Sequence, residues 1–174
     1  ILLGLVGSEM CIRDRNKVGI TVDLKSPVGL DTMKALVAES DLLLDNFTTG
    51  TLERLGLGDD VLHAANPALC VVSMSGPGKG SSLERLRSYG LVLSALGGAE
   101  LDIEADGEFV GSPTYSLSDP NAALFAGLGA LAGCLGATRA GDDETRETGV
   151  SIDLSQIEAC GALMAAHRGI DSEW

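Results

Sequence analysis

Asp119 is the residue whose type and position best fit covalent chemistry. It stands before Pro120 and opens a long apolar segment predicted to be a helix. A carboxylate at a helix start is stabilised as an anion by the free backbone amides and the helix dipole. An ionised carboxylate held in one orientation is what a nucleophilic aspartate requires. Aspartate is also a common helix N-cap, so the residues alone leave both roles open.

Two glycine-rich strings resemble nucleotide-binding motifs but lack the required context. In Gly76–Ser81 the lysine is followed by glycine rather than serine or threonine, which predicts a surface loop instead of a P-loop. Gly127, Gly129 and Gly133 lie inside the predicted helix, where a dinucleotide fingerprint cannot operate. We expect close helix packing at these glycines, and the pattern disfavours a nicotinamide-dependent dehydrogenase.

Histidines and cysteines give no sign of a metal site or a hydrolase triad. His63 and His167 lie far apart in the sequence, and Cys70, Cys134 and Cys160 share no C-x-x-C spacing. The sequence also has no G-x-S-x-G nucleophile elbow. We therefore predict no metal, three buried reduced thiols, and a location in the reducing cytoplasm.

Composition excludes two classes of partner. The 174 residues are 45% hydrophobic and carry a formal net charge of −13. A generic nucleic-acid binder or a polybasic membrane binder needs a basic face, which this balance disfavours. No apolar run approaches the ~20 residues needed to cross a bilayer. We expect no nucleic-acid partner and no membrane partner.

The hydrophobic pattern alternates between strands and helices. Strands are predicted over residues 19–24, 42–44, 69–74 and 149–154, and helices over 26–40, 51–55, 59–65, 88–96, 119–138 and 155–167. Ser26 is the predicted N-cap of the first helix, and Asp59 or Asp60 that of the third. The continuous apolar run at 42–44 is typical of a strand buried on both faces. Residues 101–110 resemble a hairpin that turns at Asp106-Gly107. The order predicts an α/β, Rossmann-like fold: an open, mostly parallel sheet with helices on both faces.

The first residues resemble a translated sequencing adapter. Leu5–Asp14 reads Leu-Val-Gly-Ser-Glu-Met-Cys-Ile-Arg-Asp, and codons of a transposase-type adapter end would encode it. A signal peptide fits less well, because no basic residue precedes the apolar run and no clear cleavage site follows. We predict that residues 1–15 are not native, and the alternative is a natural amphipathic arm.

From Asn16 onward, five stretches in order resemble the class III CoA-transferases, the family of formyl-CoA transferase and carnitine CoA-transferase. The related α-methylacyl-CoA racemases share that fold. Asp45–Gly56 is similar to the family's E-N-F-R-P-G-x-x-x-R-L-G, and Gly149–Ser155 is similar to G-x-x-V-D-V-S. The other stretches are Asn16–Lys25, Asn66–Gly76 and Ser118–Asp119. Each motif is weak alone, whereas the five together are fairly specific.

The resemblance assigns roles to particular residues. It makes Asp119 the catalytic nucleophile. It places twelve residues at the CoA site, namely Val22, Asp23, Leu24, Lys25, Asn46, Phe47, Thr48, Arg54, Arg87, Ser88, Tyr89 and Gly90. Lys25, Arg54 and Arg87 would supply cations for the CoA phosphates. The chain departs from the family at Thr48-Thr49, where the motif has R-P, and at Gly90, where it has an acidic residue.

The implied activity is transfer of CoA between an acyl-CoA thioester and a carboxylic acid through an aspartyl covalent intermediate. CoA would be a substrate rather than a tightly bound cofactor, and the full-length protein would be an interlocked homodimer. Residues 16–174 would form part of the large domain and be inactive alone. One alternative is the racemase branch, which needs a basic His where this chain has Tyr89. Another is a non-catalytic CoA-binding or assembly module.

Overall fold

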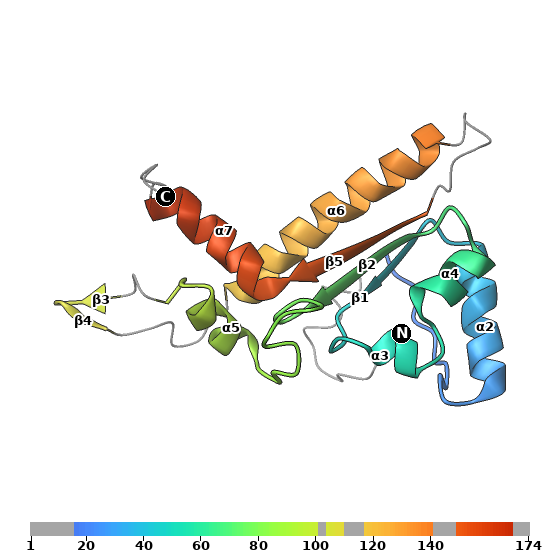
Figure 1. The fold of residues 1–174 in the computed structure, drawn as a ribbon, viewed down its shortest axis with the longest axis horizontal. Helices are drawn as coiled ribbons and strands as arrows, with labels where there is room; N and C mark the ends of the chain where they lie inside the picture. The colour runs from blue at the N-terminus through green and yellow to red at the C-terminus, as the bar shows by residue number, and fades with distance from the viewer. Residues whose placement is uncertain (1–15, 101–103, 110–116, 141–148, 169–174) are drawn as a thin grey trace.

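A three-stranded parallel sheet forms the centre of the fold (Figure 1). The computed structural model describes residues 16–100, 104–109, 117–140 and 149–168. The strands are β1 (Leu42–Asp45), β2 (Cys70–Ser75) and β5 (Val150–Ser155), in the spatial order β1-β2-β5. Cys70 of β2 lies opposite Leu42 on one side and Val150 on the other. These strands confirm three of the four predicted ones and their parallel pairing.

Six helices of the described chain connect and flank these strands. They are α2 (Pro27–Ala38), α3 (Thr51–Arg54), α4 (Asp59–Ala65), α5 (Gly90–Leu96), α6 (Ser118–Ala140) and α7 (Gln156–Arg168). Local sequence accounts for the start of α2: the Ser26 hydroxyl accepts the Gly29 N–H at 3.0 Å, and Pro27 occupies the first turn. All six were predicted to within two residues at either end.

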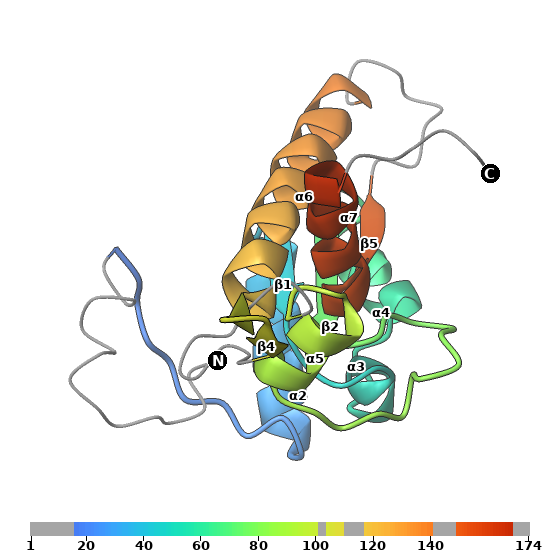
Figure 2. The same ribbon diagram turned by 90° about the vertical axis from the view of Figure 1, so that its left-hand side faces the viewer.

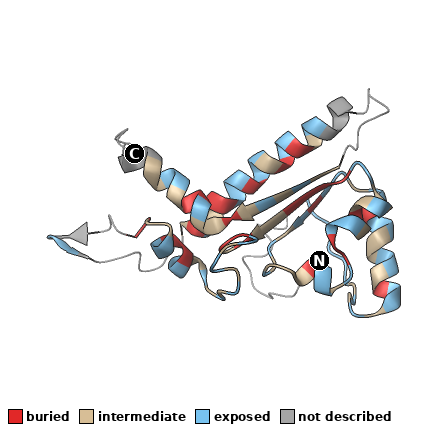
Figure 3. Cartoon of the chain, in the orientation of Figure 1, coloured by how far each residue is buried: buried red, intermediate tan, exposed pale blue. Residues whose placement is uncertain are grey.

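Helices cover both faces of the sheet, as predicted. Leu43 and Val71 point toward α2, α3 and α4, where they join a core with Val37 and Leu62. The alternate residues of β2 point the other way and pack against small residues of α6, Ala126 and Ala130. Figures 2 and 3 show the two helical layers and the buried residues between them.

A two-stranded ribbon extends from one end of the molecule. It consists of β3 (Glu104–Ala105) and β4 (Glu108–Phe109), paired antiparallel (Figure 1). Asp106 and Gly107 have φ angles of 55° and 80°, the left-handed conformation of a two-residue hairpin turn. The predicted hairpin is therefore confirmed over residues 104–109, and the rest of its predicted range lies outside the described residues.

Two strand predictions need correction. Residues 19–24 form no strand, because no neighbouring strand pairs with them in the described chain and they run into a turn at Asp23–Ser26. The run at 42–44 is buried on one face only: Leu43 is 8% exposed, whereas Leu44 is 50% exposed. β1 is an edge strand, and α6 packs mainly over β2 and β5.

Two smaller corrections concern helix starts. α4 begins at Asp59 with Gly58 as its N-cap, so neither Asp59 nor Asp60 caps it. Both carboxylates lie in the first turn, where the helix dipole favours them. α5 begins at Gly90 rather than at residue 88.

The adapter prediction concerns residues 1–15, which lie outside the described residues. Among the described helices, none is long and apolar enough to span a membrane.

α6 exposes a stripe of leucines along its outer face. Leu124, Leu128, Leu131 and Leu135 recur at helical spacing and are 58–75% exposed. Contiguous exposed apolar surface promotes association in water. We expect this chain, expressed alone, to self-associate, and light scattering over a dilution series should show it. A monodisperse monomer with a sharp thermal transition would contradict this expectation.

Candidate active site

Asp119 lies in the first turn of α6, and its neighbour Ser118 fixes that turn to α5. The Ser118 N–H donates to the Ser94 hydroxyl at 3.0 Å, and the Ser118 hydroxyl donates to the Gly90 carbonyl at 2.8 Å. Ser118 and Ser94 are fully buried, whereas Asp119 is exposed. Because the helix starts at Ser118, Asp119 is a first-turn residue and not the N-cap. Its carboxylate still lies beside the free amides, which favours the anion.

Asp119 opens into a cavity of about 540 Å³, called here the Asp119 cavity. The predicted CoA residues that line it are Asn46, Phe47, Thr48, Arg87, Ser88, Tyr89 and Gly90. The structure therefore brings three separate stretches of the sequence to one site. The sequence analysis gave no role to the other lining residues, which are Met74, Ser75, Gly76, Leu86, Leu93 and Gln156. Ser75 and Gly76 could have been identified from the sequence, because they end one of the stretches that resemble the family motifs.

Three arginines line an adjoining cavity of about 590 Å³, called here the arginine cavity. They are Arg54, Arg85 and Arg87, and Glu84 is the acidic residue of the lining. Thr48 and Arg87 line both this cavity and the Asp119 cavity, so the two adjoin. Arg85 was missed by the sequence analysis, although its spacing of two from Arg87 was a signal. Clustered guanidinium groups favour phosphate binding.

The turn before α3 holds Arg54 in place. The Arg54 Nη2 donates to the Thr51 hydroxyl at 2.6 Å, and Nη1 donates to the Thr49 carbonyl at 3.4 Å. Gly50 has a φ of 74° at this turn, a conformation that favours glycine. The short helix and its glycine turn thus fix a cation at the mouth of the arginine cavity.

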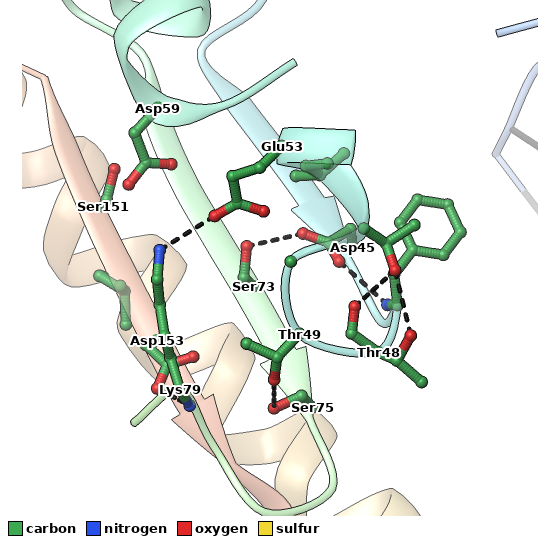
Figure 4. A pocket seen from close by; sticks show the side chains of 15 residues that line it. Asp45, Thr48, Thr49, Glu53, Asp59, Ser73, Ser75, Lys79, Ser151 and Asp153 are labelled. Atoms are coloured by element: carbon green, nitrogen blue, oxygen red, sulfur yellow. Dashed lines mark hydrogen bonds and ion pairs between the residues drawn. The ribbon is translucent and has the colours of Figure 1, made fainter. Parts of the chain in front are cut away.

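A third cavity, of about 170 Å³, lies where the parallel strands end (Figure 4). Asp45, at the end of β1, organises it: its carboxylate accepts the Ser73 hydroxyl at 2.7 Å and the Phe47 N–H at 2.9 Å. These bonds tie the loop after β1 to β2. The same loop lines the Asp119 cavity, so Asp45 positions the cavity wall without itself lining that cavity.

Lys79 crosses this third cavity (Figure 4). Its ammonium lies 3.0 Å from the Glu53 carboxylate, and its backbone N–H donates to Asp153 at 2.8 Å. The hydrogen bond and the charge of Glu53 raise the pKa of Lys79. Backbone hydrogen bonding and then Lys79 lower the pKa of Glu53. Lys79 is thus bound to carboxylates. Gly76–Ser81 is a surface loop, as predicted, and no helix follows it directly as a P-loop would require.

The remaining predicted CoA residues lie elsewhere. Val22, Asp23, Leu24 and Lys25 line none of the three cavities. Leu24 packs against the core beneath α2, and the Asp23 carboxylate accepts the Lys25 N–H at 3.0 Å. A role for these four residues in CoA binding stays a prediction.

Neither Cys160 nor His63 is among the residues that line the Asp119 cavity. The Cys160 thiol is fully buried, and this burial raises its pKa. A hydrogen bond with Asn121 lowers the pKa, and the charge of Asp119 raises it. The His63 ring pairs with the Leu69 carbonyl at 3.2 Å and lines none of the three cavities. Within the described ranges no three metal-ligating side chains cluster. Among the residues that line this cavity, Asp119 is the carboxylate, a group that can act as a nucleophile.

Comparison with known proteins identifies the family of this chain. The model of CoA-transferase family III matches residues 8–170. The chain belongs to that family. A succinyl-CoA–D-citramalate CoA-transferase from Chloroflexus aurantiacus is 38% identical over 140 residues, which cover 78% of this chain and 34% of that protein. The human α-methylacyl-CoA racemase is 35% identical over 150 residues, covering 86% of this chain and 38% of that protein.

A solved structure supports the fold. A CAIB/BAIF family protein from Brucella suis superposes with a TM-score of 0.78 at 23% identity, covering 87% of this chain and 39% of that one. This chain thus spans about a third of the length of the curated relatives described above. Membership of family III confirms the resemblance found in the sequence. It supports a CoA-transferase or racemase type of enzyme.

Proposed function

We propose that the protein transfers CoA from an acyl-CoA thioester to a carboxylic acid, with Asp119 as the covalent nucleophile. The observation that carries the proposal is the position of Asp119, an exposed carboxylate at a helix start that opens into a cavity of family III residues. The adjoining arginine cavity supports it by offering cations for the CoA phosphates. An elongated acyl-CoA could place its phosphates at the arginines and its thioester at Asp119.

The reaction then proceeds in balanced steps. An Asp119 oxygen attacks the thioester carbonyl carbon, the C–S bond breaks, and a mixed anhydride and CoA thiolate result. The thiolate attacks the Asp119 carbonyl, which releases the donor acid and leaves an aspartyl–CoA thioester. The acceptor carboxylate repeats these steps in reverse and leaves as the new acyl-CoA. Covalent capture keeps the activated acyl group from hydrolysis.

The test is transfer between a labelled acid and an acyl-CoA, followed by mass spectrometry, in the full-length protein that contains this chain. Succinyl-CoA is a suitable donor, because relatives in family III are named for it. Hydroxylamine added after the acyl-CoA should convert Asp119 to its hydroxamate, visible in the peptide that carries it. Transfer without any modification of Asp119 would contradict the covalent step.

CoA affinity should depend on the arginine cavity. Replacing Arg54 or Arg87 by alanine should weaken CoA binding by roughly tenfold each, because a charged hydrogen bond to phosphate is lost. Rising salt should weaken binding by the wild type in the same direction. Calorimetric titration with CoA measures both effects. Lys34→Ala is the matched control, since Lys34 lies on α2 and lines none of the three cavities.

Racemisation is the second candidate function, favoured by the identity to the human racemase. It requires a base that removes the α-proton of the acyl group. Tyr89 lines the Asp119 cavity where the resemblance places the racemase histidine, which favours transfer. Incubating a 2-methylacyl-CoA in D₂O separates the two, because a racemase exchanges the α-proton without a second acid and a transferase does not.

The remaining parts of the proposal concern the whole protein. We propose that it acts as a homodimer in the cytoplasm, with acyl-CoA and the acid as substrates and no tightly bound cofactor. Residues 16–174 form part of its large domain, and this part alone is inactive. A non-catalytic CoA-binding module, the other alternative, would bind CoA at the arginine cavity and show no transfer with any acid.

A further inference from the structure

Gln156 carries an unfilled hydrogen-bonding group beside the Asp119 cavity. Its side-chain oxygen Oε1 is buried and has no hydrogen-bond partner in the described part of the chain. Burying a carbonyl oxygen without a partner is unfavourable, so natural cores rarely retain one. An apolar residue of similar size would avoid this cost. The retained amide points to a partner that arrives with the substrate.

The backbone on either side of Gln156 is held by hydrogen bonds. Gln156 is the first residue of α7, directly after the last residue of β5. Its two neighbours both bond the Gly76 carbonyl: the Ser155 hydroxyl at 3.4 Å and the Ile157 N–H at 3.1 Å. The Ser155 hydroxyl also accepts the Glu158 N–H at 3.1 Å. The side chain is therefore presented from a fixed point at the cavity wall.

The lining of this cavity is partly apolar and partly polar, with Asn46, Arg87, Ser88, Tyr89 and Asp119 among its polar residues. None of them gives a hydrogen bond to the Gln156 Oε1 atom. Met74 and Leu93 are apolar, and the Ser75 hydroxyl already pairs with the Thr49 hydroxyl at 3.3 Å and the Gly78 N–H at 3.1 Å. The terminal torsion of a glutamine turns easily, which can direct Oε1 toward the cavity. An oxygen in that position accepts a hydrogen bond from a donor on the bound molecule.

We propose that Gln156 is a specificity-determining residue that accepts a hydrogen bond from a hydroxyl on the acyl group held at Asp119. The inference rests on the proposed function, because it takes the acyl group to lie in the Asp119 cavity. The substrates selected are hydroxy acids and their CoA thioesters. An acyl group without the hydroxyl leaves Oε1 unpaired, and such a site rejects the analogue that lacks the donor.

Binding by the full-length protein tests the proposal without requiring turnover. Calorimetry compares lactoyl-CoA with propionyl-CoA, and 3-hydroxybutyryl-CoA with butyryl-CoA, so that each pair differs by one hydroxyl. We expect the wild type to bind the hydroxyl form of at least one pair about three- to tenfold more tightly. Gln156→Met should bring the preferred pair to equal affinity, chiefly by losing affinity for the hydroxyl form.

The methionine variant should fold normally, since it replaces an unpaired buried amide by an apolar side chain of similar length. Glu158→Gln is the matched control: Glu158 is exposed on the same helix turn and lines none of the three cavities, so the preference should persist. No preference in the wild type, or a preference unchanged in Gln156→Met, overturns the proposal. Gln156→Met could instead lower the affinity for both members of a pair and for free CoA by the same factor. That result also overturns the proposal, because Oε1 would then bind the pantetheine arm, the part of CoA that carries the thiol.

Failure of this inference differs from failure of the proposed function. Transfer that shows no hydroxyl preference would refute the role of Gln156 and leave the transferase intact. A preference that depends on Gln156 without any transfer would support the role of Gln156 in binding and refute the transferase.

Discussion

Replacing Asp119 by asparagine should lower acyl transfer at least about a thousandfold, because the amide cannot serve as the nucleophile. The fold should persist, since Asp119 is exposed and its carboxylate has a 3.4 Å contact with the neighbouring Ser118 hydroxyl. CoA binding should also persist, because the arginine cavity does not include Asp119. Transfer kinetics, circular dichroism and calorimetry with CoA measure the three properties.

Two controls make the Asp119 result decisive. Asp31→Asn makes the same chemical change at an exposed position of α2 that lines none of the three cavities, and it should leave transfer unchanged. Mass analysis of the purified Asp119→Asn protein checks that the amide has not reverted to aspartate. If the intact amide variant still transfers CoA at the wild-type rate, Asp119 is a structural first-turn residue and the covalent mechanism is wrong.

Gly133 should be the glycine of α6 least tolerant of substitution. A Cβ built there would collide with the Cys70 sulfur and lie 3.0 Å from Val150 Cγ1, both packed in the core between α6 and the sheet. Overpacking of this kind typically costs about 1–3 kcal/mol, so we expect such a loss for Gly133→Ala and a larger one for Gly133→Val. Urea unfolding of the full-length protein, followed by circular dichroism, measures both.

The same helix supplies the control glycines. A Cβ at Gly127 or Gly136 meets no atom within 4 Å. Alanine at either position should be neutral or stabilise the helix by up to about 1 kcal/mol, because alanine has the higher helix propensity. Equal destabilisation at Gly133 and Gly127 would show that the packing of α6 on the sheet is not as described.

The three glycines of the nucleotide-like string have different roles. Close packing was predicted for all of them and is confirmed at Gly133, whereas a Cβ at Gly129 would make an ordinary contact with Ile152 at 3.5 Å. It is wrong at Gly127, which faces open space in the described chain. All three lie within one helix, and spacing alone does not show which turn of that helix approaches the sheet most closely.

The sequence determined the elements whose signals are local. The N-cap at Ser26 and the left-handed turn at Asp106-Gly107 depend on a few adjacent residues, so pattern reasoning found both. The order of strands and helices predicted the parallel sheet for the same reason. The motif residues, with Asp119 among them, pointed to the family that the comparisons confirm.

Tertiary structure decided what depends on partners distant in the sequence. A strand needs a paired neighbour, and residues 19–24 have none in the described chain despite their strand-like composition. Burial of Leu42–Leu44 depends on which strand α6 covers. Arg85 joins the candidate site because residues 84–87 and the segment around Arg54 line one cavity. Gln156 joins it because the end of β5 and the start of α6 meet at the Asp119 cavity. Side-chain type is set by the sequence, but the groups that each side chain meets are set by packing.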